Sequence, residues 1–109
     1  MAEKTELLPG TLDLLVLRVL SRGELHGWGI TNKLEQLSKR ALQVDEGSLY
    51  PALYRMEDKG WIEAEWKTTE NNRRAKYYSL TRAGRKQLET EQKLWERTSS
   101  IIAMVLESA

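Results

Sequence analysis

Residues 45–60 read DEGSLYPALYRMEDKG, and this stretch decides the fold. Three apolar residues recur at the i, i+4, i+7 spacing of one helix face: Leu49, Leu53 and Met56. The spacing predicts a helix over about 45–59. Pro51 is tolerated only near the start of a helix, so the N-cap is either Asp45 or Ser48, and the pattern does not choose between them.

Two strand-like segments follow this helix. Residues 61–67 alternate partly between apolar and polar side chains, and residues 75–80 have the composition of a second strand. Between them lies the polar stretch 68–74, in which Asn71 and Asn72 tolerate the left-handed backbone conformation that a tight turn needs. The sequence therefore predicts a β-hairpin with a polar tip.

Two further helices precede these elements. The first begins at about Thr11 and ends before Gly23, and its apolar residues cover most of its surface. The second begins near His26. Its apolar face consists of Ile30, Leu34 and Leu37. Three helices followed by a two-stranded wing, in the order α-α-α-β-β, form a winged helix-turn-helix, which we expect to occupy residues 1–80.

A long final helix is expected over 82–107, with Thr81 as its N-cap. An apolar seam runs along this helix, and nothing else in so small a domain is left to cover it. We therefore expect residues 81–109 to be a dimerisation helix that packs against a twofold-related copy. The residues expected at the dimer interface are Leu88, Trp95, Ile102, Val105 and Leu106. The fold class is mainly α, within the α+β class.

The composition excludes several classes of protein. The chain has 109 residues, no Cys and a single His, which excludes a disulfide scaffold, a thiol nucleophile and a Cys- or His-rich metal site. His26 is expected to cap or pack at a helix start rather than bind a metal or sense pH. No carboxylate pair or phosphate-binding loop suggests catalysis, so we expect no enzymatic activity, cofactor or metal.

The apolar runs are short. None approaches the roughly 20 residues that a membrane-spanning helix requires, and residues 1–6 do not resemble a signal peptide. We therefore expect a cytoplasmic protein that does not contact a membrane.

The formal net charge of +1 hides an uneven distribution. Residues 1–66 carry 8 basic and 11 acidic side chains, and residues 87–109 carry 2 basic and 4 acidic ones. The stretch 67–86 covers the hairpin and the first turns of the last helix, and it carries 7 basic side chains with only Glu70 as an acid. A basic hairpin beside a helix-turn-helix is the charge pattern expected of a protein that binds duplex DNA.

We expect the helix over 45–59 to lie in the major groove, where hydroxyl and guanidinium groups contact phosphates and base edges. Its candidate contacts are Ser48, Tyr50, Tyr54 and Arg55, although both tyrosines also suit the edge of the core. The wing residues expected to contact phosphates or the minor groove are Arg73, Arg74 and Lys76. A winged-helix module that binds proteins and not DNA is the alternative function, and the basic wing disfavours it.

Several motifs resemble those of PadR-like transcriptional regulators over nearly the whole chain. They are LDLLVL at 12–17, HGWGI at 26–30, GSLYPALYRME at 47–57, GWI at 60–62 and RRAKYYSLT at 73–81, followed by Gly84. The resemblance implies a homodimeric winged-helix repressor of the compact subgroup with one C-terminal helix. It also implies that Ser48 and Tyr50 face DNA, together with the basic wing. Trp28 departs from the family, which commonly has Tyr there.

Trp95 is a candidate ligand-binding residue. In compact members of the family that this chain resembles, an aromatic residue near this point of the last helix can line a cavity at the dimer interface. The resemblance therefore implies a small planar aromatic effector that releases the protein from DNA, whereas the apolar periodicity favours Trp95 simply packing in the seam. A twofold dimer predicts a roughly palindromic operator with half-sites about one DNA turn apart.

Overall fold

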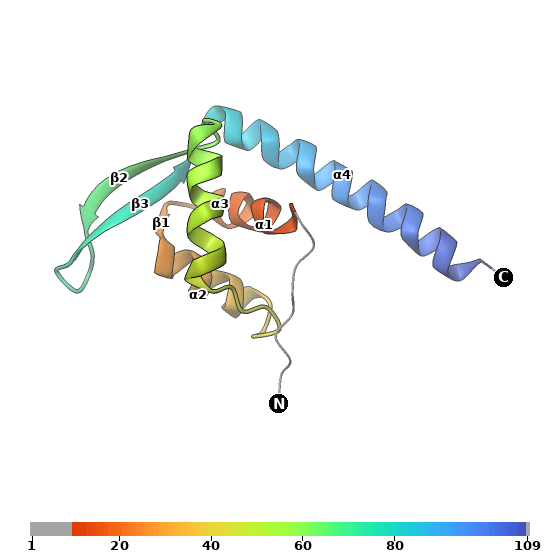
Figure 1. The fold of residues 1–109 in the computed structure, drawn as a ribbon, viewed down its shortest axis with the longest axis horizontal. Helices are drawn as coiled ribbons and strands as arrows, with labels where there is room; N and C mark the ends of the chain where they lie inside the picture. Colours follow the sequence, from red (N-terminus) through yellow and green to blue (C-terminus); the bar gives the residue numbers. More distant parts are fainter. Residues whose placement is uncertain (1–9, 109) are drawn as a thin grey trace.

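The computed structural model describes residues 10–108. Their elements follow in the order α1 (Thr11–Leu20), β1 (Leu25–His26), α2 (Gly27–Leu37), α3 (Glu46–Asp58), β2 (Ile62–Thr68), β3 (Arg74–Leu80) and α4 (Arg82–Glu107). In Figure 1 the three short helices pack together, the hairpin of β2 and β3 projects to one side and α4 runs away to the other. The expected winged helix-turn-helix with a long C-terminal helix is confirmed.

The wing, residues 62–80, belongs to a three-stranded antiparallel sheet of order β1-β3-β2. Its hairpin pairs over the whole length of both strands, from Ile62 opposite Leu80 to Thr68 opposite Arg74. The sequence did not predict β1, whose two residues pair with the middle of β3. A strand of two residues shows no alternation of polar and apolar side chains, so only the folded sheet reveals it.

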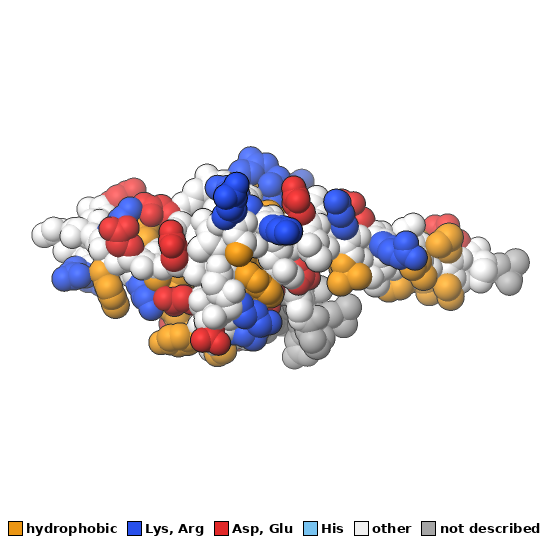
Figure 2. Space-filling view, turned by 90° about the horizontal axis from the view of Figure 1, so that it is seen from above, with side chains coloured by type: hydrophobic (Ala, Val, Ile, Leu, Met, Phe, Trp, Pro, Cys, Tyr) orange, Lys and Arg blue, Asp and Glu red, His pale blue; other side chains and the backbone are white. Residues whose placement is uncertain are grey.

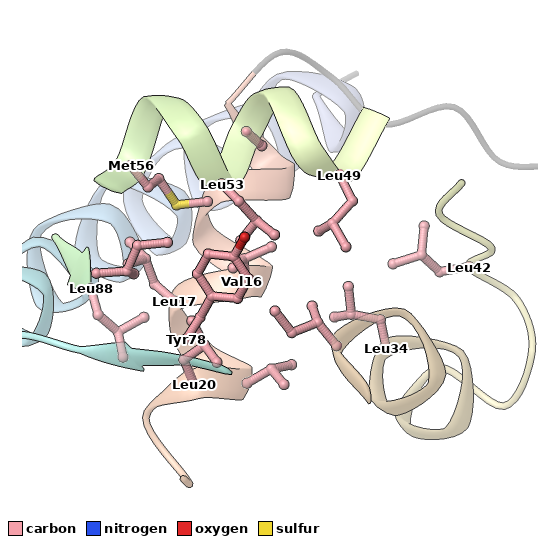
Figure 3. Packing of buried hydrophobic residues seen from close by; sticks show 14 residues of the cluster. Val16, Leu17, Leu20, Leu34, Leu42, Leu49, Leu53, Met56, Tyr78 and Leu88 are labelled. Carbon is pink, nitrogen blue, oxygen red and sulfur yellow. The ribbon is translucent and has the colours of Figure 1, made fainter. Parts of the chain in front are cut away.

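The core lies where α1, α2, α3 and the sheet meet. The residues that α1 buries there are Val16, Leu17, Val19 and Leu20. The residues that α3 buries are Leu49, Ala52, Leu53 and Met56, which include the face that the sequence predicted. Figure 3 shows these side chains meeting Tyr78 from β3 and Leu88 from α4. One face of α3 is thus held in the core, and its opposite face is exposed.

Side-chain caps fix the starts of α2 and α3. Asp45 caps α3, because its Oδ1 accepts a hydrogen bond of 2.8 Å from the backbone N–H of Ser48. This contact decides between the two N-caps that the sequence left open. His26 caps α2, and its Nδ1 accepts a hydrogen bond of 2.9 Å from the N–H of Gly29, in agreement with the expected capping role.

The start of α4 lies tightly against the segment that follows α3. Thr81 caps α4: its Oγ1 accepts a hydrogen bond of 3.0 Å from the N–H of Gly84 and donates one of 2.6 Å to the carbonyl of Gly60. Gly84 is buried, and a Cβ there would overlap the backbone carbonyl of Trp61. Only glycine permits this approach, so α4 leaves the domain in a fixed direction.

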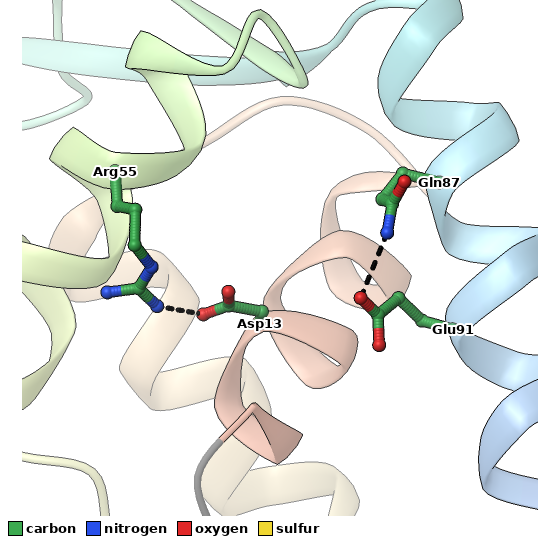
Figure 4. A network of polar contacts seen from close by, with 4 residues as sticks. All are labelled: Asp13, Arg55, Gln87 and Glu91. Atoms are coloured by element: carbon green, nitrogen blue, oxygen red, sulfur yellow. Dashed lines mark hydrogen bonds and ion pairs between the residues drawn. The ribbon is translucent and has the colours of Figure 1, made fainter.

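The first turns of α4 pack on the domain. The side chains of Gln87 and Glu91 lie toward α1 and share a hydrogen bond of 2.9 Å (Figure 4). Leu88 was expected at the dimer interface, and this expectation is corrected. The side chain is only 9% exposed and belongs to the core of its own domain, because α4 still lies against α1 and β3 at this point.

The second half of α4 extends beyond the domain. Its apolar side chains are exposed, and Figure 2 shows them gathered at the far end of the helix. The exposed apolar residues of this half are Leu94, Trp95, Ile101, Ile102, Met104, Val105 and Leu106. No helix within residues 10–108 is long and apolar enough to cross a membrane.

Candidate nucleic-acid interface

The exposed side of α3 presents the sequence-predicted contacts on two flanks. With 3.6 residues per turn, Tyr50 and Tyr54 lie on one flank of the buried face, and Ser48 and Arg55 lie on the other. Tyr54 is 68% exposed, so it is not a core residue. Tyr50 lies against Gly27 at the start of α2. The tyrosine flank faces the wing, and the other flank does not.

Arg55 makes a contact that the sequence did not predict. Its Nη2 donates to Oδ1 of Asp13 at 2.5 Å, and Figure 4 shows this ion pair joining α3 to α1. Asp13 is the one buried charged side chain within residues 10–108, whereas the side chain of Arg55 is 49% exposed. The pair therefore fixes α3 against α1 and leaves part of the guanidinium accessible.

The tip of the wing is an ordered turn. Thr69 donates its backbone N–H to the carbonyl of Arg73 at 2.6 Å, and its Oγ1 accepts the N–H of Arg73 at 3.2 Å. Asn72 has a φ of 59°, the left-handed conformation expected for this turn. The guanidinium of Arg74 lies 5.8 Å from the centre of the Trp66 ring. Both arginines are exposed at the tip.

Lys76 links the wing to α3. Its Nζ lies 3.5 Å from Oε1 of Glu57, 5.9 Å from the ring centre of Tyr54 and 5.8 Å from that of Tyr78. Tyr78 is itself buried, and this burial, aided by Glu57 and neighbouring tyrosines, raises the pKa of its hydroxyl to about 12. Nearer β1, a hydrogen bond with Glu24 raises the pKa of Lys67.

The basic stretch 67–86 does not form one surface. Arg73 and Arg74 lie at the start of β3, whereas the basic residues of α4 follow its other end. A seven-residue strand spans roughly 20 Å, so two basic regions are separated by that distance. Figure 2 shows Lys and Arg side chains over the first turns of α4. Only the wing part lies beside the exposed face of α3.

A hollow of about 720 Å³ lies between the wing, α3 and the start of α2. It brings together five of the seven sequence-predicted contacts: Tyr50, Tyr54, Arg73, Arg74 and Lys76. Ser48 and Arg55 lie outside it. The sequence did not predict that three further residues with aromatic rings also line the hollow, namely His26, Trp28 and Trp66. For Trp66, the one signal was a tryptophan in the mostly polar stretch EAEWKT at 63–68.

This arrangement of a helix and a basic wing can be compared with known proteins. Residues 16–90 match the Transcriptional regulator PadR-like family. This chain belongs to the PadR-like family. A transcriptional regulator of Mycobacterium tuberculosis is 31% identical over 83 residues, which cover 76% of this chain and 74% of that protein.

Solved structures of PadR-like proteins share the fold. A PadR-like transcriptional regulator from Bacillus cereus is 30% identical with a TM-score of 0.80, over 96% of this chain and 100% of that one. A PadR family transcription regulator from Clostridium difficile R20291 is 29% identical with a TM-score of 0.75, over 89% and 99% of the two chains. Membership of the PadR-like family makes this chain a DNA-binding transcription regulator and not an enzyme.

Proposed function

We propose that the chain is a homodimeric repressor that binds a palindromic operator. The observation that carries this proposal is the placement of a cationic wing tip and the exposed side of α3 around one hollow. With α3 in the major groove, the wing reaches the adjacent backbone or minor groove. Such a regulator works where the chromosome lies, which places it in the cytoplasm.

Each predicted contact has a role in this arrangement. Ser48 and the two tyrosines of α3 present hydroxyls to base edges and phosphates, and the exposed part of Arg55 is available to guanine. The wing cations Arg73, Arg74 and Lys76 neutralise phosphates, which supplies affinity without sequence selectivity.

The proposed dimer interface lies on the far half of α4. Trp95 is 46% exposed, Ile102 50%, Val105 67% and Leu106 78%, so this half presents a long apolar surface to water. Exposed apolar surface on this scale marks an interface, and a second copy carries the same surface in a geometry that a twofold axis can satisfy. The twofold then relates two copies of α3, and hence two operator half-sites.

A planar aromatic effector is proposed to bind beside Trp95 at that interface and to release the operator. The indole offers a broad ring face and one N–H donor. The test is quenching of tryptophan fluorescence by a panel of planar aromatic compounds. We expect quenching that Trp95→Ala abolishes while the other three tryptophans still report. Quenching that survives in Trp95→Ala, or none across the panel, would leave Trp95 as a packing residue.

The function is tested by selecting genomic fragments on the immobilised protein, followed by footprinting. We expect enrichment of a roughly palindromic sequence with half-site centres about 34–36 Å apart. Addition of the protein to a reporter carrying that sequence should lower transcription. Enrichment of fragments without dyad symmetry would contradict the dimeric reading, and activation of the reporter would contradict the repressor assignment.

A further inference from the structure

The side chain of Arg55 on α3 is held by an ion pair to another helix. Within residues 10–108, the one partner of its guanidinium is Asp13 of α1, whose Oδ1 lies 2.5 Å from Nη2 (Figure 4). A guanidinium carries five N–H donors in a planar fork, so this contact leaves most of the donors unused. The side chain of Arg55 is 49% exposed, so a partner outside the domain can reach them.

The position of Asp13 is fixed by α1. The carboxylate lies in the first turn of this helix, where the positive end of the helix dipole favours a negative charge. Val16 and Leu17 on the next turn are fully buried, so α1 cannot shift without disturbing the core. Asp13 itself is 8% exposed, and its side chain is therefore held between α1 and α3.

A guanidinium that is tied at one end reads a base more selectively than a free one. Arginine recognises guanine through two parallel hydrogen bonds to O6 and N7, which require the plane of the fork to be aligned with the base edge. A free arginine loses side-chain entropy when it adopts that orientation. An arginine that the protein already orients avoids part of this loss, and it reaches partners in one direction only.

We propose that Asp13 is a positioning residue that directs Arg55 to one guanine of each operator half-site. Asp13 acts through the orientation of the Arg55 fork and does not itself touch DNA. In this way α1 contributes to sequence selectivity without contacting a base. The inference rests on the proposed function, because it requires α3 to lie in the major groove. It deepens that function by naming the residue that sets the selectivity of Arg55.

The test compares the operator found by selection with copies in which each guanine of the half-site is replaced in turn by 7-deazaguanine, which lacks the N7 acceptor. For the wild type we expect one position at which the replacement raises the Kd about tenfold, the discrimination expected of one arginine–guanine pair. Arg55→Ala should bind the original and the replaced operator equally at that position. Asp13→Asn keeps the shape of the side chain, removes its charge and should lose most of the difference.

The affinity for a random duplex separates positioning from a merely structural role. Removal of the Asp13 carboxylate removes a negative charge that repels phosphates, so Asp13→Asn should bind random DNA as tightly as the wild type or more tightly. If the ion pair served only to hold α3 against α1, the same variant would weaken the operator, the replaced operator and random DNA by one common factor. Titrations of all three DNAs at one salt concentration distinguish these results.

Two further variants complete the design. Glu24→Gln is the matched control, because it removes the carboxylate of an ion pair with Lys67 that joins the segment before β1 to β2. This variant should discriminate against 7-deazaguanine like the wild type. Arg55→Lys tests the orientation even if Asp13→Asn does not fold. A lysine can still pair with Asp13, but its ammonium lacks the planar fork, so this variant should fold and lose most of the discrimination.

The positioning role is overturned if no guanine of the half-site shows the tenfold difference, or if Asp13→Asn or Arg55→Lys keeps the full difference. It is also overturned if Asp13→Asn weakens all three DNAs equally. In each of these cases the operator is still bound, and the proposed function stands. A wild type that selects no operator would instead refute the proposed function, and the role of Asp13 with it.

Discussion

At the scale of the residue, Tyr78 of the wing is buried in the core that it shares with α3. Its pKa of about 12 exceeds the ordinary value of 10.0 because burial favours the neutral form. The unfolded chain releases this proton near pH 10, so between pH 10 and pH 12 the folded protein holds more protons than the unfolded chain. Linkage then requires the free energy of unfolding to fall as pH rises through that window.

Tyr78→Phe removes this titration. The variant's free energy of unfolding should therefore fall less steeply above pH 10 than that of the wild type. Urea unfolding at a series of pH values from about 9 upward measures how steeply the free energy of unfolding falls with pH in each protein. The ionisation of lysines contributes equally to the slope of the wild type and of the variant. Parallel slopes would show that Tyr78 ionises at its ordinary pKa.

Gly84 is a second residue whose role is local. Gly84→Ala places a methyl group against the carbonyl of Trp61, and such overpacking costs roughly 2 kcal/mol of unfolding free energy. Gly47→Ala is the matched control, because its Cβ would meet only Oδ1 of Asp45 at 3.4 Å. Thermal unfolding should show a lower Tm for the first variant and an unchanged or higher one for the second. Equal Tm values would mean that α4 can shift to accept a side chain.

At the scale of the element, the wing is proposed to act through phosphate contacts. Arg74→Ala should weaken operator and non-specific DNA by similar factors and reduce the salt slope of log K by about one unit. Arg97→Ala on α4 is the control and should leave the slope unchanged. The slope comes from binding titrations at several salt concentrations. A variant with an unchanged slope would show that Arg74 touches no phosphate.

The elements also show how far the sequence predicts this protein. Helical periodicity, turn residues and charge predicted every helix and the hairpin, because those signals are local. The ion pair of Asp13 and Arg55 spans 42 positions, and β1 exists only through pairing with β3, so neither has a local signal. Leu88 was misassigned because periodicity identifies an apolar face and does not say what covers it.

At the scale of the whole molecule, the proposed dimer depends on the exposed half of α4. Ile102→Glu puts a charge into the apolar stripe and should convert the dimer into a monomer, since a buried unpaired carboxylate is costly. Ser100→Glu adds the same charge about half a turn away, outside the stripe, and should remain dimeric. Sedimentation equilibrium at micromolar concentration distinguishes the two. A wild-type protein that sediments as a monomer would contradict the proposed dimer.

The ion pair between Asp13 and Arg55 has a consequence at this scale as well. Asp13 of α1 forms an ion pair with Arg55 of α3. On the side of α1 toward α4 lie Gln87 and Glu91, whose side chains share a hydrogen bond (Figure 4). In the proposed dimer joined through α4, each α1 would therefore connect the dimer helix to α3, so the fixed direction of α4 would set the distance between the two copies of α3. The angle at which two copies of α4 cross would then determine the spacing of half-sites that the proposed dimer recognises.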